Sequence, residues 1–284
     1  MTPTAWRSQG QFLDWRGLRI FHRSEGSGEP LLLLHGFPTS SWDWHHLWAD
    51  LGKKYQVIAF DYAGFGFSSK PADGPYSVFA YADQAEAVLQ QYGIGEVHLL
   101  AHDLGDTVAQ ELLARSHERF LSVCLLNGGI FPELHRPRLI QRLLASPLGP
   151  LVSRSINQKR FAKSFGEIFG PDTQPGAEEL AGFWECVGSG VHIYHRLIGY
   201  MRERRVNRER WVPALLDESV PLAFIDGLVD PISGAHVVQR LRELRPGTRI
   251  TELAGIGHYP QTEAPAAVLN AYRDFRALVA KTAR

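Results

Sequence analysis

The sequence predicts an α/β fold in which helices flank a mostly parallel, eight-stranded sheet and a helical cap is inserted into the chain. Short β-rich runs alternate with longer segments of helical periodicity, which is typical of a parallel sheet. This alternation stops after Asn127 and resumes near Pro221. The segment between them is rich in arginine and aromatic residues and is broken repeatedly by proline and glycine. We therefore assign residues 1–129 and 212–284 to the sheet domain and residues 130–211 to the cap.

The individual elements follow from the same patterns. Strands are expected at residues 12–16, 18–23, 31–35, 57–61, 97–102, 122–126, 222–226 and 249–253. The first two are separated by Gly17 and should form an antiparallel hairpin at the sheet edge. Helices of the sheet domain are expected at residues 41–51, 78–92, 104–115, 235–244 and 265–281.

Several strands end at side chains that can do chemistry, namely His35, Asp61, Asp103, Asn127 and Asp226. Ligands of open α/β sheets bind beyond the carboxyl ends of the strands. We therefore expect a functional site at that edge of the sheet.

Charge and composition argue against several classes of protein. Lys+Arg and Asp+Glu both number 30, and this balance disfavours a nucleic-acid partner. The two cysteines, Cys124 and Cys186, provide neither a disulfide framework nor zinc-site spacing, and Cys124 is expected to be a buried thiol. The first residues lack the apolar core of a signal peptide, and no apolar run has membrane-spanning length. We expect a cytoplasmic protein without a membrane partner.

Asp103 is the candidate nucleophile. It lies in a turn between the apolar run 97–102 and the helix 104–115, and the small residues Ala101 and Gly105 flank it. Such a turn is typical of a nucleophile elbow, where small neighbours let strand and helix approach. A carboxylate that attacks saturated carbon forms an ester that water can hydrolyse. The alternative is that Asp103 only caps the helix.

His258 and Asp230 are the expected partners of Asp103. His258 follows the last strand and Asp230 follows the one before it, so the chain order is nucleophile, acid, histidine. Asp230 would orient the imidazole and stabilise its charged form. The alternatives are a turn role for Asp230, a structural role for the histidine, and Asp226 as the acid. Asn127, at another position where such an acid can stand, carries no charge.

Three further motifs have expected roles. The turn His35-Gly36-Phe37-Pro38 and the residue after the nucleophile would supply the oxyanion-hole N–H groups of Phe37 and Leu104, unless the former is an ordinary strand-end turn. The Gly-x-Gly at residues 64–66 lacks the third glycine of a dinucleotide site and should be a rigid turn. The arginine-rich run 200–211 is expected to be a solvated helix face.

Together these motifs resemble the α/β-hydrolases that use an aspartate nucleophile, which are the epoxide hydrolases and haloalkane dehalogenases. Within that branch the chain looks most like an epoxide-hydrolase-like group known from vertebrates. The resemblance spans nearly the whole chain and is carried by residues 12–21, 35–40, 64–68, 102–103, 127–133, 135–137, 210–212 and 258–261. It implies the α/β-hydrolase fold, the triad Asp103–His258–Asp230, and no metal or organic cofactor.

The resemblance also discriminates between chemistries. Typical haloalkane dehalogenases have Asn after the His-Gly pair and Trp after the nucleophile, whereas this chain has Phe37 and Leu104. Fluoroacetate dehalogenases place Arg after the nucleophile. Epoxide hydrolases have His-Gly-aromatic-Pro, as here, and two cap tyrosines that protonate the epoxide oxygen. Tyr200-Met201-Arg202 resembles the second tyrosine, and Tyr194 is the candidate for the first.

The resemblance therefore implies a hydrolase that opens epoxides to vicinal diols through an ester on Asp103, with Tyr200 as the proton donor. A small hydrophobic substrate is expected to contact His35, Tyr194, Phe131 and Trp184. Two alternatives stay open: a haloalkane dehalogenase that uses the same ester, and a binding protein that keeps the fold without turnover. A monomer and a homodimer are both compatible with the sequence.

Overall fold

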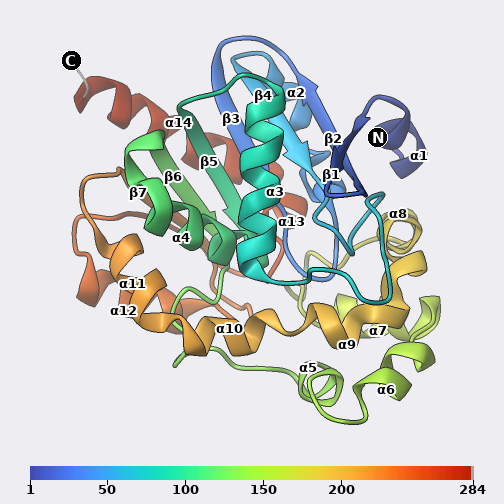
Figure 1. Cartoon of the computed structure of the whole chain (residues 1–284). Helices are drawn as coiled ribbons and strands as arrows, with labels where there is room; N and C mark the ends of the chain where they lie inside the picture. The colour runs from blue at the N-terminus through green and yellow to red at the C-terminus, as the bar shows by residue number, and fades with distance from the viewer. Residues whose placement is uncertain (283–284) are drawn as a thin grey trace.

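A computed structural model describes residues 1–282 and contains one eight-stranded sheet (Figure 1). The strand order is β1-β2-β4-β3-β5-β6-β7-β8. The strands are β1 (Gln11–Trp15), β2 (Leu18–Glu25), β3 (Glu29–Leu34), β4 (Tyr55–Phe60), β5 (Val97–His102), β6 (Phe120–Leu126), β7 (Leu222–Gly227) and β8 (Arg249–Leu253). β2 pairs antiparallel with β1 and β4, and all other pairs are parallel. The predicted sheet is confirmed.

The hairpin at the sheet edge is closed by Arg16 and Gly17, both of which have positive φ angles, 53° and 80°. Two-residue hairpin turns need this backbone because its twist matches that of the strands. The central strands are buried on both faces, as residues 31–34 of β3 and 97–102 of β5 illustrate. In Figure 1, α3 (Val78–Gln91) and α4 (Leu104–Ser116) cover one face and α14 (Pro265–Thr282) covers the other. Coverage of both faces explains why these strands lack polar alternation.

The predicted helix at residues 41–51 is divided in two. The structure has a 3-10 turn, η1 (Ser41–Trp44), followed by α2 (Trp48–Gly52). The backbone bonds from Asp43 N to Ser40 O, from His45 N to Trp42 O and from Leu47 N to Trp44 O all span three residues, so an α-helical turn does not form here. The short helices α1 (Pro3–Ser8) and α13 (Pro260–Glu263) were not expected, whereas α12 (Ala235–Leu244) has the predicted bounds.

The helices inserted between β6 and β7 lie across the carboxyl end of the sheet, at the bottom of Figure 1. They are α5 (Leu139–Leu144), α6 (Gly149–Ser155), α7 (Gln158–Gly166), α8 (Ala177–Val187), η3 (Gly188–Ile193), α9 (Tyr194–Leu197), α10 (Tyr200–Val206) and α11 (Arg208–Leu216). The expected boundary between residues 211 and 212 falls within α11, which packs on α4. There Trp211 Nε1 donates a hydrogen bond to Glu111. No helix within residues 1–282 is long and apolar enough to cross a membrane.

Candidate active site

Asp103 occupies the sharp turn between β5 and α4. Its φ of 47° and ψ of −103° lie in a region that non-glycine residues rarely adopt. Its buried side chain makes no capping hydrogen bond to α4, so the helix-cap alternative is wrong. A Cβ atom added to Gly105 would lie 2.3 Å from the carbonyl oxygen of Leu34 in β3. The glycine therefore permits the close packing of helix and strand that the turn requires.

Each oxygen of the Asp103 carboxylate has a nearby donor. The Phe37 N–H donates to Oδ2 at 3.1 Å. On the other side, Arg204 Nη2 lies 3.3 Å from Oδ1 and donates to the Asp103 carbonyl oxygen at 2.9 Å. Leu104 is the first residue of α4, and the N–H groups of a first helical turn have no partner within the helix. The carboxylate thus lies beside the two residues that the sequence nominates for an oxyanion hole.

Arg204 is the main residue that sequence reasoning missed. It lies in α10 with a side-chain exposure of only 2%, so the expected solvated face is wrong at this position, although Arg202 and Arg205 are exposed. Its guanidinium donates to Thr107 Oγ1 at 2.6 Å and covers the ring of Tyr200 at 4.6 Å. The signal in the sequence was the four-residue spacing of Tyr200 and Arg204, which places both on one helix face.

Charge holds Asp103 in its ionised form. Burial acts to raise the pKa of Asp103, but the positive charge of Arg204 lowers it, as do His258 and His102 and the Phe37 N–H. The result is a pKa below the usual value for aspartate. Asp106, one turn further along α4, is buried beside this charge, and burial raises the pKa of its carboxyl well above the usual range. Asp106 is therefore neutral next to the ionised Asp103.

His258 is held by Asp230. Its Nδ1 donates to Asp230 Oδ2 at 2.7 Å, and both side chains are buried. Asp230 also accepts backbone N–H bonds from Ile232 at 2.7 Å and Ser233 at 3.1 Å. Burial acts to lower the pKa of His258, but the charge and hydrogen bond of Asp230 raise it above the usual value. This arrangement fixes the tautomer and leaves Nε2 as the proton acceptor.

The structure also decides between Asp230 and the alternative acid, Asp226. Burial raises the pKa of Asp226 to about 9, so that carboxyl is neutral at pH 7, and it makes no hydrogen bond within residues 1–282. Asn127 contributes to the site by hydrogen bonding rather than by carrying a charge. Its Nδ2 donates to Asp230 Oδ2 at 3.1 Å, and its Oδ1 accepts the Gly227 N–H at 2.8 Å. Asn127 thus positions the acid at the end of β7.

Asp103 and His258 line a cavity of about 400 Å³. Its wall is mostly apolar and includes Phe37, Pro38, Ile140, Leu143, Leu144, Phe161, Phe165, Ile168, Tyr194 and Ile232. Several of these residues come from α5 and α7, so the cap forms much of the wall. A space of this size and polarity suits a small hydrophobic molecule.

Of the four residues predicted to contact the substrate, only Tyr194 lines this cavity. His35, Phe131 and Trp184 lie outside its lining. His35 has both ring nitrogens engaged, with Nδ1 bonded to the Gly36 carbonyl and Nε2 to the Tyr62 N–H. Phe131 is fully buried in the core. The Trp184 ring packs on the wall residue Phe161, with ring centroids 5.6 Å apart. The sequence identified aromatic residues near the cavity, but it could not distinguish those that line the cavity from those that pack behind the lining.

Both candidate tyrosines pack near the ring of Phe37. The ring centroids of Tyr194 and Tyr200 are 5.3 and 5.8 Å from that of Phe37. The Tyr194 hydroxyl donates to the Pro38 carbonyl at 3.3 Å, whereas the buried Tyr200 hydroxyl makes no hydrogen bond of ordinary geometry within residues 1–282. Burial, and then the charge of Asp103, raise the pKa of Tyr200, while Arg204 and a hydrogen bond with the Gln141 side chain oppose this. Tyr200 therefore stays protonated, but unlike Tyr194 it is not among the residues that line the cavity.

Comparison with known proteins fits this architecture. A sequence profile for the alpha/beta hydrolase fold matches residues 29–153. The mesoderm-specific transcript homolog protein of Bos taurus is 41% identical over 290 residues, covering 95% of this chain and 87% of the relative. A Shewanella oneidensis protein named cis-3-alkyl-4-alkyloxetan-2-one decarboxylase is 27% identical and covers 93% of this chain and 87% of its own length. The crystal structure of the haloalkane dehalogenase DatA from Agrobacterium tumefaciens superposes with a TM-score of 0.81 at 20% identity, covering 95% of this chain and 96% of that one.

Proposed function

Because this chain belongs to the α/β-hydrolase family, we propose that it is a hydrolase that opens epoxides to vicinal diols through a covalent ester on Asp103. The observation that carries the proposal is the Asp103 carboxylate itself. It stands on a strained turn, lines an apolar cavity, and receives the Phe37 N–H on one oxygen. A carboxylate can displace a leaving group at saturated carbon and still give an intermediate that water cleaves.

The first step is attack on the epoxide. The Phe37 N–H is bonded to Oδ2 of Asp103, and Oδ1, which pairs with Arg204 Nη2 at 3.3 Å, is the oxygen that attacks a ring carbon. The new C–O bond forms as the ring C–O bond breaks, and the epoxide oxygen becomes an alkoxide. The Tyr200 hydroxyl, which lies beside the side chain of the cavity residue Gln141, gives its proton to that oxygen. The product is a hydroxyalkyl ester of Asp103.

The second step hydrolyses the ester. His258 Nε2 takes a proton from water, and the oxygen of that water attacks the ester carbonyl carbon of Asp103. The N–H groups of Phe37 and Leu104 would hold the tetrahedral oxyanion, a contribution of about 3–4 kcal/mol per donor in other enzymes. Collapse releases the diol, which takes the proton from His258. The carboxylic acid left on Asp103 then ionises, and its proton restores Tyr200.

Arg204 bears on the choice of substrate. Esterification removes the negative charge of Asp103 and leaves a buried guanidinium without its ion-pair partner. An unpaired buried charge is costly, so this site favours substrates whose opening leaves an anion inside the site. An epoxide meets this condition because its opening takes the proton of Tyr200, whose ring lies 4.6 Å from the Arg204 guanidinium, and leaves the negative charge on that tyrosine. A haloalkane releases its anion instead, and Phe37 and Leu104 carry no side-chain donor for a halide.

The same observation favours one second candidate substrate, a four-membered cyclic ester. Attack of Asp103 on the ring carbon that bears the ester oxygen would release a carboxylate, which could pair with Arg204. The Shewanella relative is named for a reaction of such an oxetan-2-one. The two candidates share the nucleophile and the cavity and differ in the leaving oxygen.

Intact-mass analysis of the His258→Ala variant tests the proposal. Attack needs only Asp103 whereas hydrolysis needs His258, so the ester should accumulate. An epoxide or an oxetanone adds its whole mass, and a haloalkane adds its mass less that of the hydrogen halide. Asp103→Ala is the control that should gain nothing. A panel of the three classes that leaves no adduct on Asp103 refutes the nucleophilic role.

A further inference from the structure

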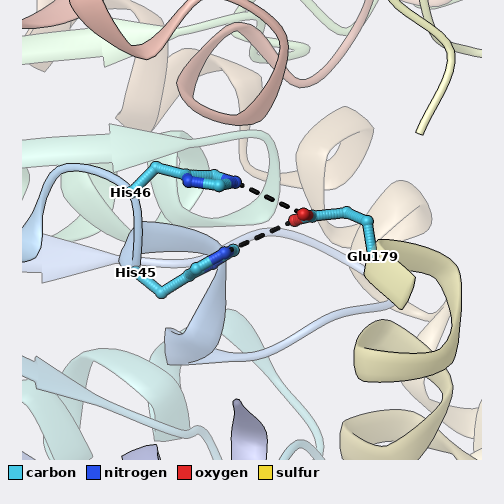
Figure 2. A group of neighbouring side chains, drawn as sticks. All are labelled: His45, His46 and Glu179. Atoms are coloured by element: carbon cyan, nitrogen blue, oxygen red, sulfur yellow. Dashed lines mark hydrogen bonds and ion pairs between the residues drawn. The ribbon is translucent and has the colours of Figure 1, made fainter. Parts of the chain in front are cut away.

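Three side chains that can bind a metal converge outside the cavity lining, where the sheet domain meets the cap (Figure 2). His45 and His46 directly follow η1, and Glu179 lies in the first turn of α8. His45 Nε2 is 3.5 Å from Glu179 Oε1, and His46 Nε2 is 3.3 Å from Glu179 Oε2. One ligand atom from each residue lies within 4.8 Å of both others. Figure 2 shows both imidazole rings directed at the carboxylate.

The contact between His45 and Glu179 lacks a hydrogen. His45 Nδ1 lies 2.8 Å from the Trp42 carbonyl, which only accepts, so Nδ1 carries the proton. With that proton on Nδ1, the neutral imidazole holds its lone pair on Nε2. That lone pair faces Glu179 Oε1, a buried oxygen without a hydrogen-bond donor within residues 1–282. A cation bound to both would stabilise these two electron-rich atoms.

We propose that His45, His46 and Glu179 bind a divalent transition-metal ion of the Zn²⁺ class. Two imidazoles and one carboxylate, completed by a water, are a known zinc ligand set. Bonds of about 2.0–2.1 Å in tetrahedral geometry separate ligand atoms by about 3.3–3.4 Å. The observed separations, 3.5 Å from His45 Nε2 to Oε1 and 3.3 Å from His46 Nε2 to Oε2, are close to that spacing but involve different oxygens, so binding through one oxygen requires a small shift of the carboxylate. Ca²⁺ and Mg²⁺ prefer oxygen ligands and fit this set poorly.

Neighbouring residues hold the imidazole of His45 in an orientation suited to binding a metal ion. Metal-binding histidines usually donate their second ring N–H to a carbonyl or carboxylate, as His45 does to Trp42. The Trp42 ring also stacks on His45, with centroids 4.0 Å apart and planes 3° apart. His46 is 36% exposed, which gives an ion a path from solvent and room for the fourth ligand. The terminal ammonium of Met1 is another positive charge that acts on His45 and Glu179.

A metal at this place would join the sheet domain to α8. The same helix carries Phe183, whose ring contacts both Trp42, at 5.1 Å, and Tyr259, at 5.9 Å. Tyr259 follows His258 in the chain. Fixing α8 would therefore steady the packing next to the proposed base, and the ion would have a structural role that does not depend on the chemistry proposed for Asp103.

The test is metal titration of the full chain after dialysis against a chelator. Zn²⁺ binding is measured by calorimetry, and Co²⁺ is added as a probe because tetrahedral Co²⁺ absorbs strongly in the visible range. We expect one ion per chain and a rise in Tm of about 5–10 °C at a metal concentration 100 times Kd. His46→Ala and Glu179→Gln should each lose more than about 100-fold in affinity, above the 10–100-fold cost of losing an outer partner.

Both variants change partly exposed side chains, and circular dichroism checks that they fold. His117→Ala is the matched control, since His117 lies 3.9 Å from Glu118 in an exposed pair that belongs to no three-ligand group within residues 1–282. Its metal affinity should equal that of the unmodified chain. Absence of stoichiometric binding to the unmodified chain overturns the proposal. So does binding that survives in folded His46→Ala and Glu179→Gln.

Discussion

Replacing Arg204 with methionine should raise the pKa of Asp103 and move the acid limb of ester formation to higher pH. The charges are 3.3 Å apart and buried. At an effective dielectric constant of about 20, two unit charges at this distance attract by about 5 kcal/mol. At 1.36 kcal/mol per pKa unit this sets an upper limit of about 3.7 units. Aspartates beside arginine are typically shifted by about 1–3 units, which is the rise we expect.

The sign follows from the state that attacks. Ester formation needs the carboxylate, so its rate falls as the pH drops through the pKa of Asp103. Arg204 holds that pKa below the usual value, and its loss should remove activity at mildly acidic pH first. The depressed pKa also stabilises the fold above the unfolded value of about 3.9, and this stabilisation is lost as the pH falls through the folded value.

The assay is the rate of adduct formation between pH 4 and 8 in the His258→Ala background, where hydrolysis is blocked and His258 does not titrate. Arg205→Met is the matched control, because Arg205 neighbours Arg204 but is exposed. Its pH profile should coincide with that of the background. Loss of one partner of a buried ion pair can cost about 3–5 kcal/mol, so near-ultraviolet circular dichroism must show that Arg204→Met is folded. If the folded variant keeps the acid limb of the background, Arg204 does not set the pKa of Asp103.

Three other changes have defined outcomes. Asp230→Asn should slow ester hydrolysis about 10⁴-fold, as the equivalent change does in serine proteases. It should also lower the pKa of His258, so the base-dependent limb of the pH profile shifts to lower pH; an unchanged rate of adduct decay would contradict this. Tyr200→Phe should slow adduct formation from an epoxide about 10²–10⁴-fold but spare formation from an alkyl halide, and an equal loss with both would exclude proton donation. Gly105→Ala should lower the free energy of unfolding in urea by about 1–3 kcal/mol, because its Cβ would lie 2.3 Å from a backbone oxygen of β3. Gly95→Ala, with no heavy atom within 4 Å of its Cβ, should not, and equal effects would contradict the packing argument.

Local sequence patterns were sufficient for most of the sheet domain. The observed bounds of β5, β8 and α12 coincide with those predicted, since hydrophobic periodicity and neighbouring breakers are local signals. The helix expected at residues 41–51 was wrong in detail because three-residue hydrogen bonds replace its first turn. That difference matters, since it presents His45 and His46 to the cap.

The sequence by itself determined the order of the candidate site residues along the chain. Asp103 comes first, in a small-residue turn after β5, and is followed by Asp230 and then His258. These residues could be nominated because each follows a strand, and parallel strands bring their carboxyl ends to one edge. Only the tertiary structure decided what surrounds them. Arg204 lies about a hundred positions from Asp103 in the chain, and its contact depends on how α10 crosses the sheet edge. Which aromatic residues line the cavity was likewise decided by packing between helices, a long-range property that no local pattern encodes.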